Sequence, residues 1–177
     1  MATNKVSPLA IIVFAATIVV LFVNYLAVGM LDASATNSIA AKYPTPVSPA
    51  GYSASILTII YLLSLGFAVY QLLPSKAAKF AGIRITYILT CILNCLWVVA
   101  WYRSMLLLSA FLIVALLGTL IAMLGPVKNV ETAMEALLAK GTFGLYAGWV
   151  TVMGLVNILA LVRSQEVAMT DGAFQTL

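Results

Sequence analysis

Residues 83–124 read IRITYILTCILNCLWVVAWYRSMLLLSAFLIVALLGTLIAML, two long apolar runs separated by Arg103 and Ser104. Each run has the length of about 20 residues that an α-helix needs to cross a hydrocarbon core about 30 Å thick. Because the connection is so short, the two helices must lie side by side and run in opposite directions. This stretch predicts a transmembrane helical hairpin with helices over 83–102 and 105–124.

The composition extends this interpretation to the whole chain. Hydrophobic residues make up 64% of the chain, charged residues only 8%, and the mean hydropathy is +1.12, whereas soluble proteins are about half apolar. Three more apolar runs cover 8–30, 54–73 and 142–162, and Arg84 is the single charged residue inside the five. The polarity of the runs does not alternate as barrel strands would. We predict an all-α membrane protein, a single bundle of five transmembrane helices that forms one domain over 1–177.

The connection between the first and second runs is rich in proline. Residues 42–61 read KYPTPVSPAGYSASILTIIY, and tyrosines bracket the prolines. Polar, proline-rich segments are typical of linkers, whereas the flanking aromatic side chains would also suit a segment that covers a site. Both alternatives stay open at this point. The residues concerned are Tyr43, Pro44, Pro46, Pro49 and Tyr52.

Residues 129–141, NVETAMEALLAKG, differ from the spans because they are amphipathic. Asn129 can cap the start of a helix and Gly141 can close its end. We predict a short helix over 129–140 that lies at the cytoplasmic surface. The tail after Arg163 is polar, and we expect it to be frayed. The apolar face of the surface helix would consist of Val130, Met134, Leu137 and Leu138.

Basic residues are distributed unevenly between the two sides of the predicted bundle. Six lie on the side of the N-terminus and three on the other. The positive-inside rule then places the N-terminus in the cytoplasm, and we predict an integral protein of a bacterial cytoplasmic membrane. The net charge of +4 fits this topology and attraction to anionic lipid, so we expect no nucleic-acid partner. The two groups are Lys5, Lys76, Lys79, Arg84, Lys128 and Lys140, and Lys42, Arg103 and Arg163.

Several kinds of chemistry are missing from the sequence. Histidine is absent and no acidic residue lies inside a predicted span, which removes the usual proton relays and imidazole metal sites. Cys91 and Cys95 are one turn apart, but two thiols alone make a weak metal site and favour packing. No evident base is present to activate a nucleophile. We predict no catalytic residue, no metal ligand and no required cofactor.

Aromatic and amide side chains are concentrated on two of the predicted helices. They recur there at spacings of three and four, which places them on one face of each helix. An unpaired amide in hydrocarbon is costly, so these side chains must face protein, water or a ligand. They could join helices and fill the bundle, or they could line a cavity for a flat ligand. The two stripes are Thr90, Asn94, Trp97 and Trp101, and Tyr146, Trp149, Met153 and Asn157, with Asn24 as a third intramembrane amide.

A GxxxG pattern occurs in the fifth run, at Gly144 and Gly148. Such a pattern permits the close approach of another helix. The partner would be an internal helix of the bundle or the same helix of a second copy of the chain. A homodimer is therefore one of the partners that we predict.

Four motifs taken together resemble the TspO/MBR family, also called tryptophan-rich sensory proteins or peripheral benzodiazepine receptors. They are the proline-rich first loop, SPAGYSASILTIIYLLSLGFAVYQ, LNCLWVVAWYR and LYAGWVTVMGLVN. Their order and spacing cover most of the chain, from about residue 24 to 157. The resemblance implies a bundle of five helices whose first loop folds over a pocket at one membrane face. By this resemblance the proline-rich segment is a lid.

The resemblance also implies ligands and site residues. Members of the family bind tetrapyrroles such as protoporphyrin and haem, sterols, and synthetic benzodiazepine-like drugs. Leu57 stands where the second-helix motif has a tryptophan, an indole that usually forms one wall of the tetrapyrrole pocket. The positions that match the family's motifs are Tyr61, Asn94, Trp97, Trp149 and Asn157.

The function that we predict is a membrane receptor or carrier rather than an enzyme. A flat hydrophobic ligand, a tetrapyrrole or a sterol-like lipid, would lie between Trp97, Trp101 and Trp149. Asn94 and Asn24 would orient it, with Tyr61, Tyr146 and Asn157 completing the site. Membrane lipid and this small ligand are the expected partners. A small oligomeric transporter or facilitator of hydrophobic compounds is the alternative.

Overall fold

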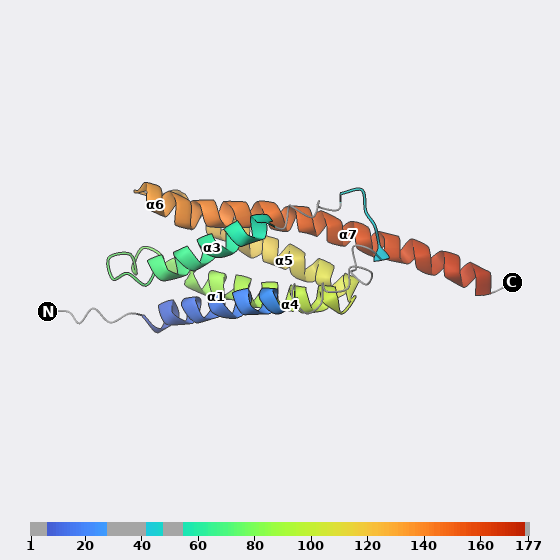
Figure 1. Ribbon diagram of the computed structural model, residues 1–177. Coiled ribbons are helices and arrows are strands. Elements are labelled where there is room, and N and C mark those ends of the chain that lie inside the picture. The colour runs from blue at the N-terminus through green and yellow to red at the C-terminus, as the bar shows by residue number, and fades with distance from the viewer. Residues whose placement is uncertain (1–6, 28–41, 48–54, 176–177) are drawn as a thin grey trace.

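The computed structural model describes residues 7–27, 42–47 and 55–175, and in this part of the chain long helices lie side by side in a bundle. Successive helices run up and down the bundle, and α7 projects beyond the others at one end (Figure 1). No strand occurs among the described residues, so the predicted all-α fold class is confirmed. The main helices are α1 (Pro8–Leu26), α3 (Ser55–Tyr70), α4 (Arg84–Tyr102), α5 (Leu106–Leu124) and α7 (Thr142–Gln175).

The predicted hairpin is formed by α4 and α5. Its turn places Ser104 at a φ of 58°, a left-handed conformation that serine adopts less readily than glycine. The amide of Ser104 donates to Trp101 O at 2.9 Å, and that of Met105 donates to Ala100 O at 2.9 Å. These bonds pair carbonyls at the end of α4 that would otherwise be unsatisfied.

Four helices of the described residues are long and apolar enough to cross a membrane, and α3, with 16 residues, is shorter. The prediction of a second span over 54–73 is wrong at its end, because α3 stops at Tyr70. Gln71, which is fully buried, instead donates from Nε2 to Ala10 O at 2.9 Å and accepts a 3.0 Å bond from Arg84 Nε. Tertiary hydrogen bonds therefore end the helix before its apolar run ends.

The predicted surface helix over 129–140 is also wrong as a separate element. Helix begins only at α6 (Ala133–Glu135), continues through the π-helix η6 (Ala136–Gly141) and enters α7 without a break. Thr132, not Asn129, caps the start, because its side chain accepts a 3.2 Å bond from the amide of Glu135. Gly141 lacks the positive φ that is typical of a residue that ends a helix, and the helix continues through it into α7.

The tail after Arg163 was predicted to be frayed, and this is wrong as well. Helix α7 continues to Gln175, and Figure 1 shows this extension projecting past the bundle. One turn into it, Arg163 Nη1 and Glu166 Oε2 form an ion pair at 2.7 Å. The predicted end of the first span, 28–30, lies outside the described residues.

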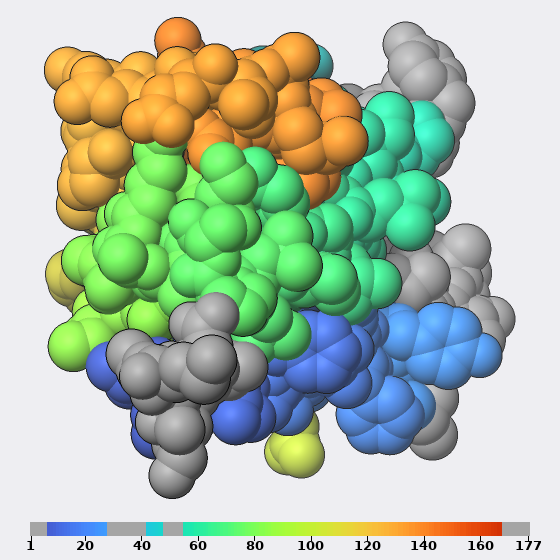
Figure 2. Space-filling view, turned by 90° about the vertical axis from the view of Figure 1, so that its left-hand side faces the viewer, coloured from blue at the N-terminus to red at the C-terminus, as the bar shows by residue number. Residues whose placement is uncertain are grey.

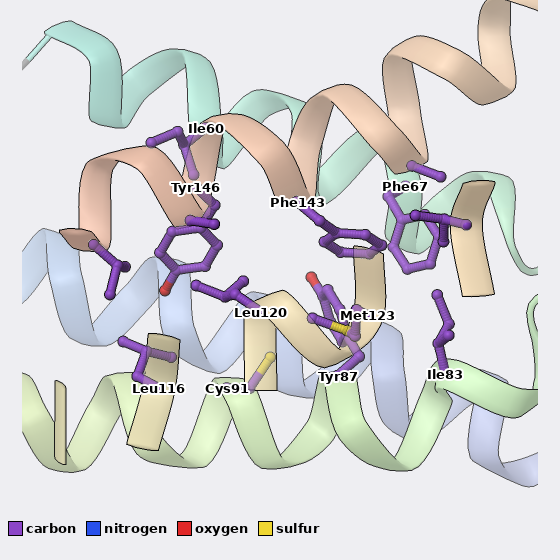
Figure 3. Packing of buried hydrophobic residues seen from close by; sticks show 14 of the residues in the cluster. Ile60, Phe67, Ile83, Tyr87, Cys91, Leu116, Leu120, Met123, Phe143 and Tyr146 are labelled. Atoms are coloured by element: carbon purple, nitrogen blue, oxygen red, sulfur yellow. The ribbon is translucent and has the colours of Figure 1, made fainter. Parts of the chain in front are cut away.

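An aromatic cluster forms the centre of one half of the bundle. Phe67, Phe80, Tyr87 and Phe143 come from different segments and are all buried; Figure 3 shows Phe67, Tyr87 and Phe143 turned toward one another. The ring of Phe67 lies 4.9 Å from that of Phe143 and 5.4 Å from that of Tyr87. Such edge and tilted contacts add to the stabilisation from apolar burial.

Charged side chains join two segments at the end of the bundle seen in Figure 2, where residues around α6 (orange) lie against residues 71–84 (green). The carboxylate of Glu135 is fully buried, with Oε1 2.7 Å from Lys76 Nζ and Oε2 2.7 Å from Lys79 Nζ. These hydrogen bonds raise the pKa of Lys76 and of Lys79. We call Glu135, Lys76 and Lys79 the ion cluster. No sequence pattern had singled out Glu135.

Candidate functional site

Three polar side chains from three helices form a hydrogen-bonded chain inside the bundle. Asn24 of α1 donates from Nδ2 to Asn94 Oδ1 of α4 at 2.8 Å, and Asn94 Nδ2 donates to Tyr146 Oη of α7 at 2.7 Å. All three residues are buried. Pairing the amides with each other satisfies the requirement that polar groups in hydrocarbon be hydrogen-bonded.

A cavity of about 140 Å³ lies beside this chain. Residues from all five main helices line it, and none of the described residues that line it is charged. Its wall is therefore apolar and aromatic with a few polar atoms, which is the composition of a site for a hydrophobic ligand. The lining residues are Asn24, Ala27, Leu57, Tyr61, Asn94, Trp97, Val98, Trp101, Tyr102, Ile113, Leu116, Tyr146, Trp149, Val150 and Met153.

The tryptophans supply the largest surfaces of this wall. Trp97 and Trp101, one turn apart on α4, stack with ring centroids 6.2 Å apart and planes 23° from parallel. Trp149 of α7 also lines the cavity. The sequence contains three tryptophans, so every tryptophan of the chain lines this one cavity.

The indole nitrogen of Trp97 is a donor without a partner. Trp97 Nε1 is a buried side-chain atom that has no hydrogen bond in the part of the chain that the structure describes. A buried donor left unpaired costs about 1–3 kcal/mol.

Seven of the eight predicted ligand-binding residues come together around the cavity. They are Asn24, Tyr61, Asn94, Trp97, Trp101, Tyr146 and Trp149. The eighth, Asn157, does not line it: it is fully buried and donates from Nδ2 to Ser109 Oγ at 3.0 Å. Asn157 shares a face of α7 with Trp149 but lies about 12 Å farther along the helix. It joins α7 to α5 there.

The described residues of the predicted lid lie against α7. Tyr43 packs on the buried cluster of Trp101, Leu106, Val156 and Ala160, and Pro44 and Pro46 border a surface hollow beside Leu159 and Val162. None of these three lid residues lines the cavity. Pro49 and Tyr52 lie outside the described residues, so the lid itself stays a prediction.

Several cavity residues had no signal in the sequence. Ile113 and Leu116 of α5, and Val98 and Val150, line the cavity although their spacing is that of any buried apolar residue. Only the packing of α5 between α4 and α7 shows that these side chains face a hollow. Tyr102 also lines the cavity, and its position next to Trp101 was the one available hint.

Cysteines and glycines can now be placed. Cys91 and Cys95 are free, and Cys91 packs in the buried core; no group of three or more metal-binding side chains occurs among the described residues. Gly144 and Gly148 lie on the outer face of α7, where an added Cβ would meet nothing within 4 Å. No described helix uses the GxxxG pattern, so its use between two copies of the chain stays a prediction.

Comparison with known proteins identifies the family. Neither the curated proteins nor the solved structures gave a match. The family model described as TSPO-like protein matches residues 10–174, a range that includes every residue lining the cavity. Since the match covers nearly the whole chain, this integral membrane protein belongs to the TSPO-like family.

Proposed function

We propose that the protein is a membrane receptor or carrier that binds a flat hydrophobic ligand, of tetrapyrrole or sterol type, in the cavity lined by its tryptophans. The observation that carries this proposal is the cavity wall, which holds all three tryptophans of the chain together with a few uncharged polar side chains. Aromatic faces bind a flat ligand by stacking. The polar side chains of the wall, Asn24 and Asn94 among them, would fix its orientation.

The polar groups of the cavity support binding in preference to acid–base chemistry. Asn24, Asn94 and Tyr146 are already hydrogen-bonded to one another, so they can position a ligand without supplying a strong base. The lining residues contain no carboxylate, lysine or arginine. An uncharged ligand can therefore enter and leave the site without an ion pair being formed or broken, which would suit a carrier.

The proposal is tested by titrating the purified protein in detergent with protoporphyrin IX and, separately, with the fluorescent sterol dehydroergosterol. Because all three tryptophans line the cavity, quenching of intrinsic tryptophan fluorescence reports directly on the site. We expect saturable quenching by at least one of the two ligands. Trp149→Phe should weaken the affinity about 10-fold, as expected for a lost indole face, and Leu57→Trp should change it because Leu57 lines the wall.

A matched control is Phe111→Leu, on the exposed face of α5, which should leave the affinity unchanged. Quenching that rises linearly with ligand in the wild-type protein and in every variant would contradict the proposal. The facilitator of hydrophobic compounds would then become the leading function, and flux of the same ligands across vesicles would be the next measurement.

A further inference from the structure

A second hollow lies on the outer side of the cavity wall. It has a volume of about 430 Å³ and lies between α1 and α3, and we call it the lateral groove. Asn24, Leu57 and Tyr61 line both the groove and the cavity, so the same three side chains separate the two spaces. The remaining groove residues are Leu21, Tyr25, Ser55 and Thr58.

The cavity alone is too small for the ligands under discussion. At about 140 Å³ it is similar to a cavity of about 150 Å³ that holds one benzene, whereas sites for drug-sized ligands have about 300–1,000 Å³. One ring of a sterol would fill it. The rest of such a molecule needs adjoining space, and the lateral groove provides this on the far side of Leu57.

The surroundings of the groove show which medium it opens to. Phe22 on α1 is 60% exposed, and Ile59 and Leu62 on α3 are 52% and 64% exposed. In a helix of a membrane bundle, large exposed apolar side chains face lipid. The groove therefore opens toward acyl chains, and its occupant comes from the bilayer.

The groove is also more polar than the surface around it. Tyr25, Thr58 and Tyr61 bring hydroxyl groups to a groove that opens among lipid-facing side chains, and Asn24 lies where the groove meets the cavity. Asn24 and Tyr25 lie in the last turn of α1 and Thr58 in the first turn of α3, so the groove lies at one end of the spans, where amphipathic side chains meet the membrane interface. A purely hydrocarbon chain would gain nothing from them, whereas an amphiphile would.

We infer that the ligand enters sideways from the bilayer through the lateral groove and then rests across groove and cavity. Its leading ring lies in the cavity, beside the tryptophans and the polar side chains of the wall, and its apolar body lies in the groove between α1 and α3. The occupant is thus an elongated, membrane-dissolved amphiphile of sterol dimensions. This inference rests on the proposed function and adds the route and the shape of the ligand.

The test uses two ketones of different length with the full chain in phosphatidylcholine nanodiscs. Cholest-4-en-3-one needs both spaces, and cyclohexanone fits the cavity alone. Thr58→Phe fills the groove without reaching the cavity lining, and Leu62→Phe adds the same ring to an exposed part of α3 outside the groove. Tryptophan fluorescence measures binding of the sterol ketone, and saturation-transfer NMR measures binding of cyclohexanone.

We expect Thr58→Phe to weaken cholest-4-en-3-one at least 10-fold and to leave cyclohexanone within about twofold, because only the longer ligand occupies the groove. Leu62→Phe should leave both ligands unchanged. Wild-type affinity of Thr58→Phe for the sterol ketone would overturn the inference. If the wild-type protein binds neither ketone, nor protoporphyrin IX, the proposed function itself is wrong.

Thr58→Phe could lose affinity for both ketones because the new ring alters the packing of the bundle. A second measurement tests the lateral route in that case. A diazirine-bearing sterol is incorporated into vesicles with the wild-type protein and activated by light, and the labelled residues are identified by mass spectrometry. Labels on Leu21, Tyr25 or Thr58 would support the lateral route. Labels confined to other lipid-facing residues would overturn it.

Discussion

The aromatic cluster and the cavity are built from the same helices and from similar residues, yet one is filled and the other is hollow. In the cluster, the rings of Phe67, Phe143 and Tyr87 meet edge-on or tilted at 4.9–5.9 Å. In the cavity, Trp97 and Trp101 stack nearly parallel and leave about 140 Å³ beside them.

Helix α3 shows how closely the two regions adjoin. Phe67 contributes to the cluster and Tyr61 to the cavity, although they are only about 9 Å apart along the helix. The polar atoms differ as well, because the amides of Asn24 and Asn94 line the cavity. We infer from this comparison that the half with the aromatic cluster supplies most of the stability. The half with the cavity can then contain a binding site that its own side chains do not fill.

The largest expected effect comes from removing a ring of the cluster. Phe143→Ala should lower the free energy of unfolding by about 3–5 kcal/mol, since Phe143 is fully buried and its loss leaves a void. Trp149→Ala should cost less, about 1–2 kcal/mol, because part of its surface already faces a cavity. Chemical unfolding in mixed micelles measures both, with the exposed Phe111→Ala as control. Equal losses for Phe143 and Trp149 would break the comparison.

The ion cluster should have the next largest effect, at the end of the packed half. Glu135→Gln removes the shared partner of Lys76 and Lys79 and should lower Tm by about 5 °C, whereas the exposed Glu166→Gln should lower it little. The two lysine pKa values are raised, so their stabilisation is present at neutral pH and is lost as the pH rises through the raised values. A thermal scan at pH 7 in which the two variants melt together would refute this role.

Two asparagines allow the polar atoms of the two regions to be compared. Asn94→Leu removes the hydrogen bonds to Asn24 and Tyr146, and Asn157→Leu removes those to Ser109. Each should cost about 1–2 kcal/mol of stability. Only Asn94→Leu should also weaken ligand binding, which the fluorescence titration measures. A loss of affinity in Asn157→Leu of the same size would mean that the site extends beyond the cavity.

The smallest effect on stability is expected for Trp97→Phe, which keeps most of the ring and removes the unpaired donor. The free energy of unfolding should stay the same or rise by less than about 1 kcal/mol, because no hydrogen bond is lost. The affinity for cholest-4-en-3-one should fall less than in Trp149→Ala, because an aromatic ring still lines the cavity at position 97. An equal loss in the two variants would mean that the whole indole of Trp97 is needed at the site.

Much of the site could be predicted because its residues are unusual in a membrane helix. Asn24, Asn94 and the tryptophans stand out against an apolar background, and helical spacing placed them on common faces. Asn157 stood out equally and yet joins α5 through Ser109, since a stripe on a helix does not say which neighbour it meets at each level. Ile113 and Leu116 could not be predicted, because an apolar side chain beside a cavity looks like one in a filled core.

The fold could be predicted where hydrophobicity decides it and not where specific hydrogen bonds do. The spans of α1, α4 and α5 follow from apolar length alone. The early end of α3 depends on the buried Gln71, which bonds to Ala10 and Arg84. The junction of α6 with α7 likewise depends on Thr132 as the cap and on Gly141 remaining helical.

The sequence by itself determined that the chain lies in a membrane, that it crosses as helices, and which polar and aromatic side chains had to find partners there. These properties follow from the cost of unpaired polar groups in hydrocarbon, which is local and can be read residue by residue. Only the tertiary structure decided that the amides pair with one another, that the indole nitrogen of Trp97 has no hydrogen-bond partner among the described residues, and that a cavity remains between the tryptophans. Those outcomes depend on how side chains from five helices fill a shared space, and packing is a property of the assembled helices rather than of any one of them.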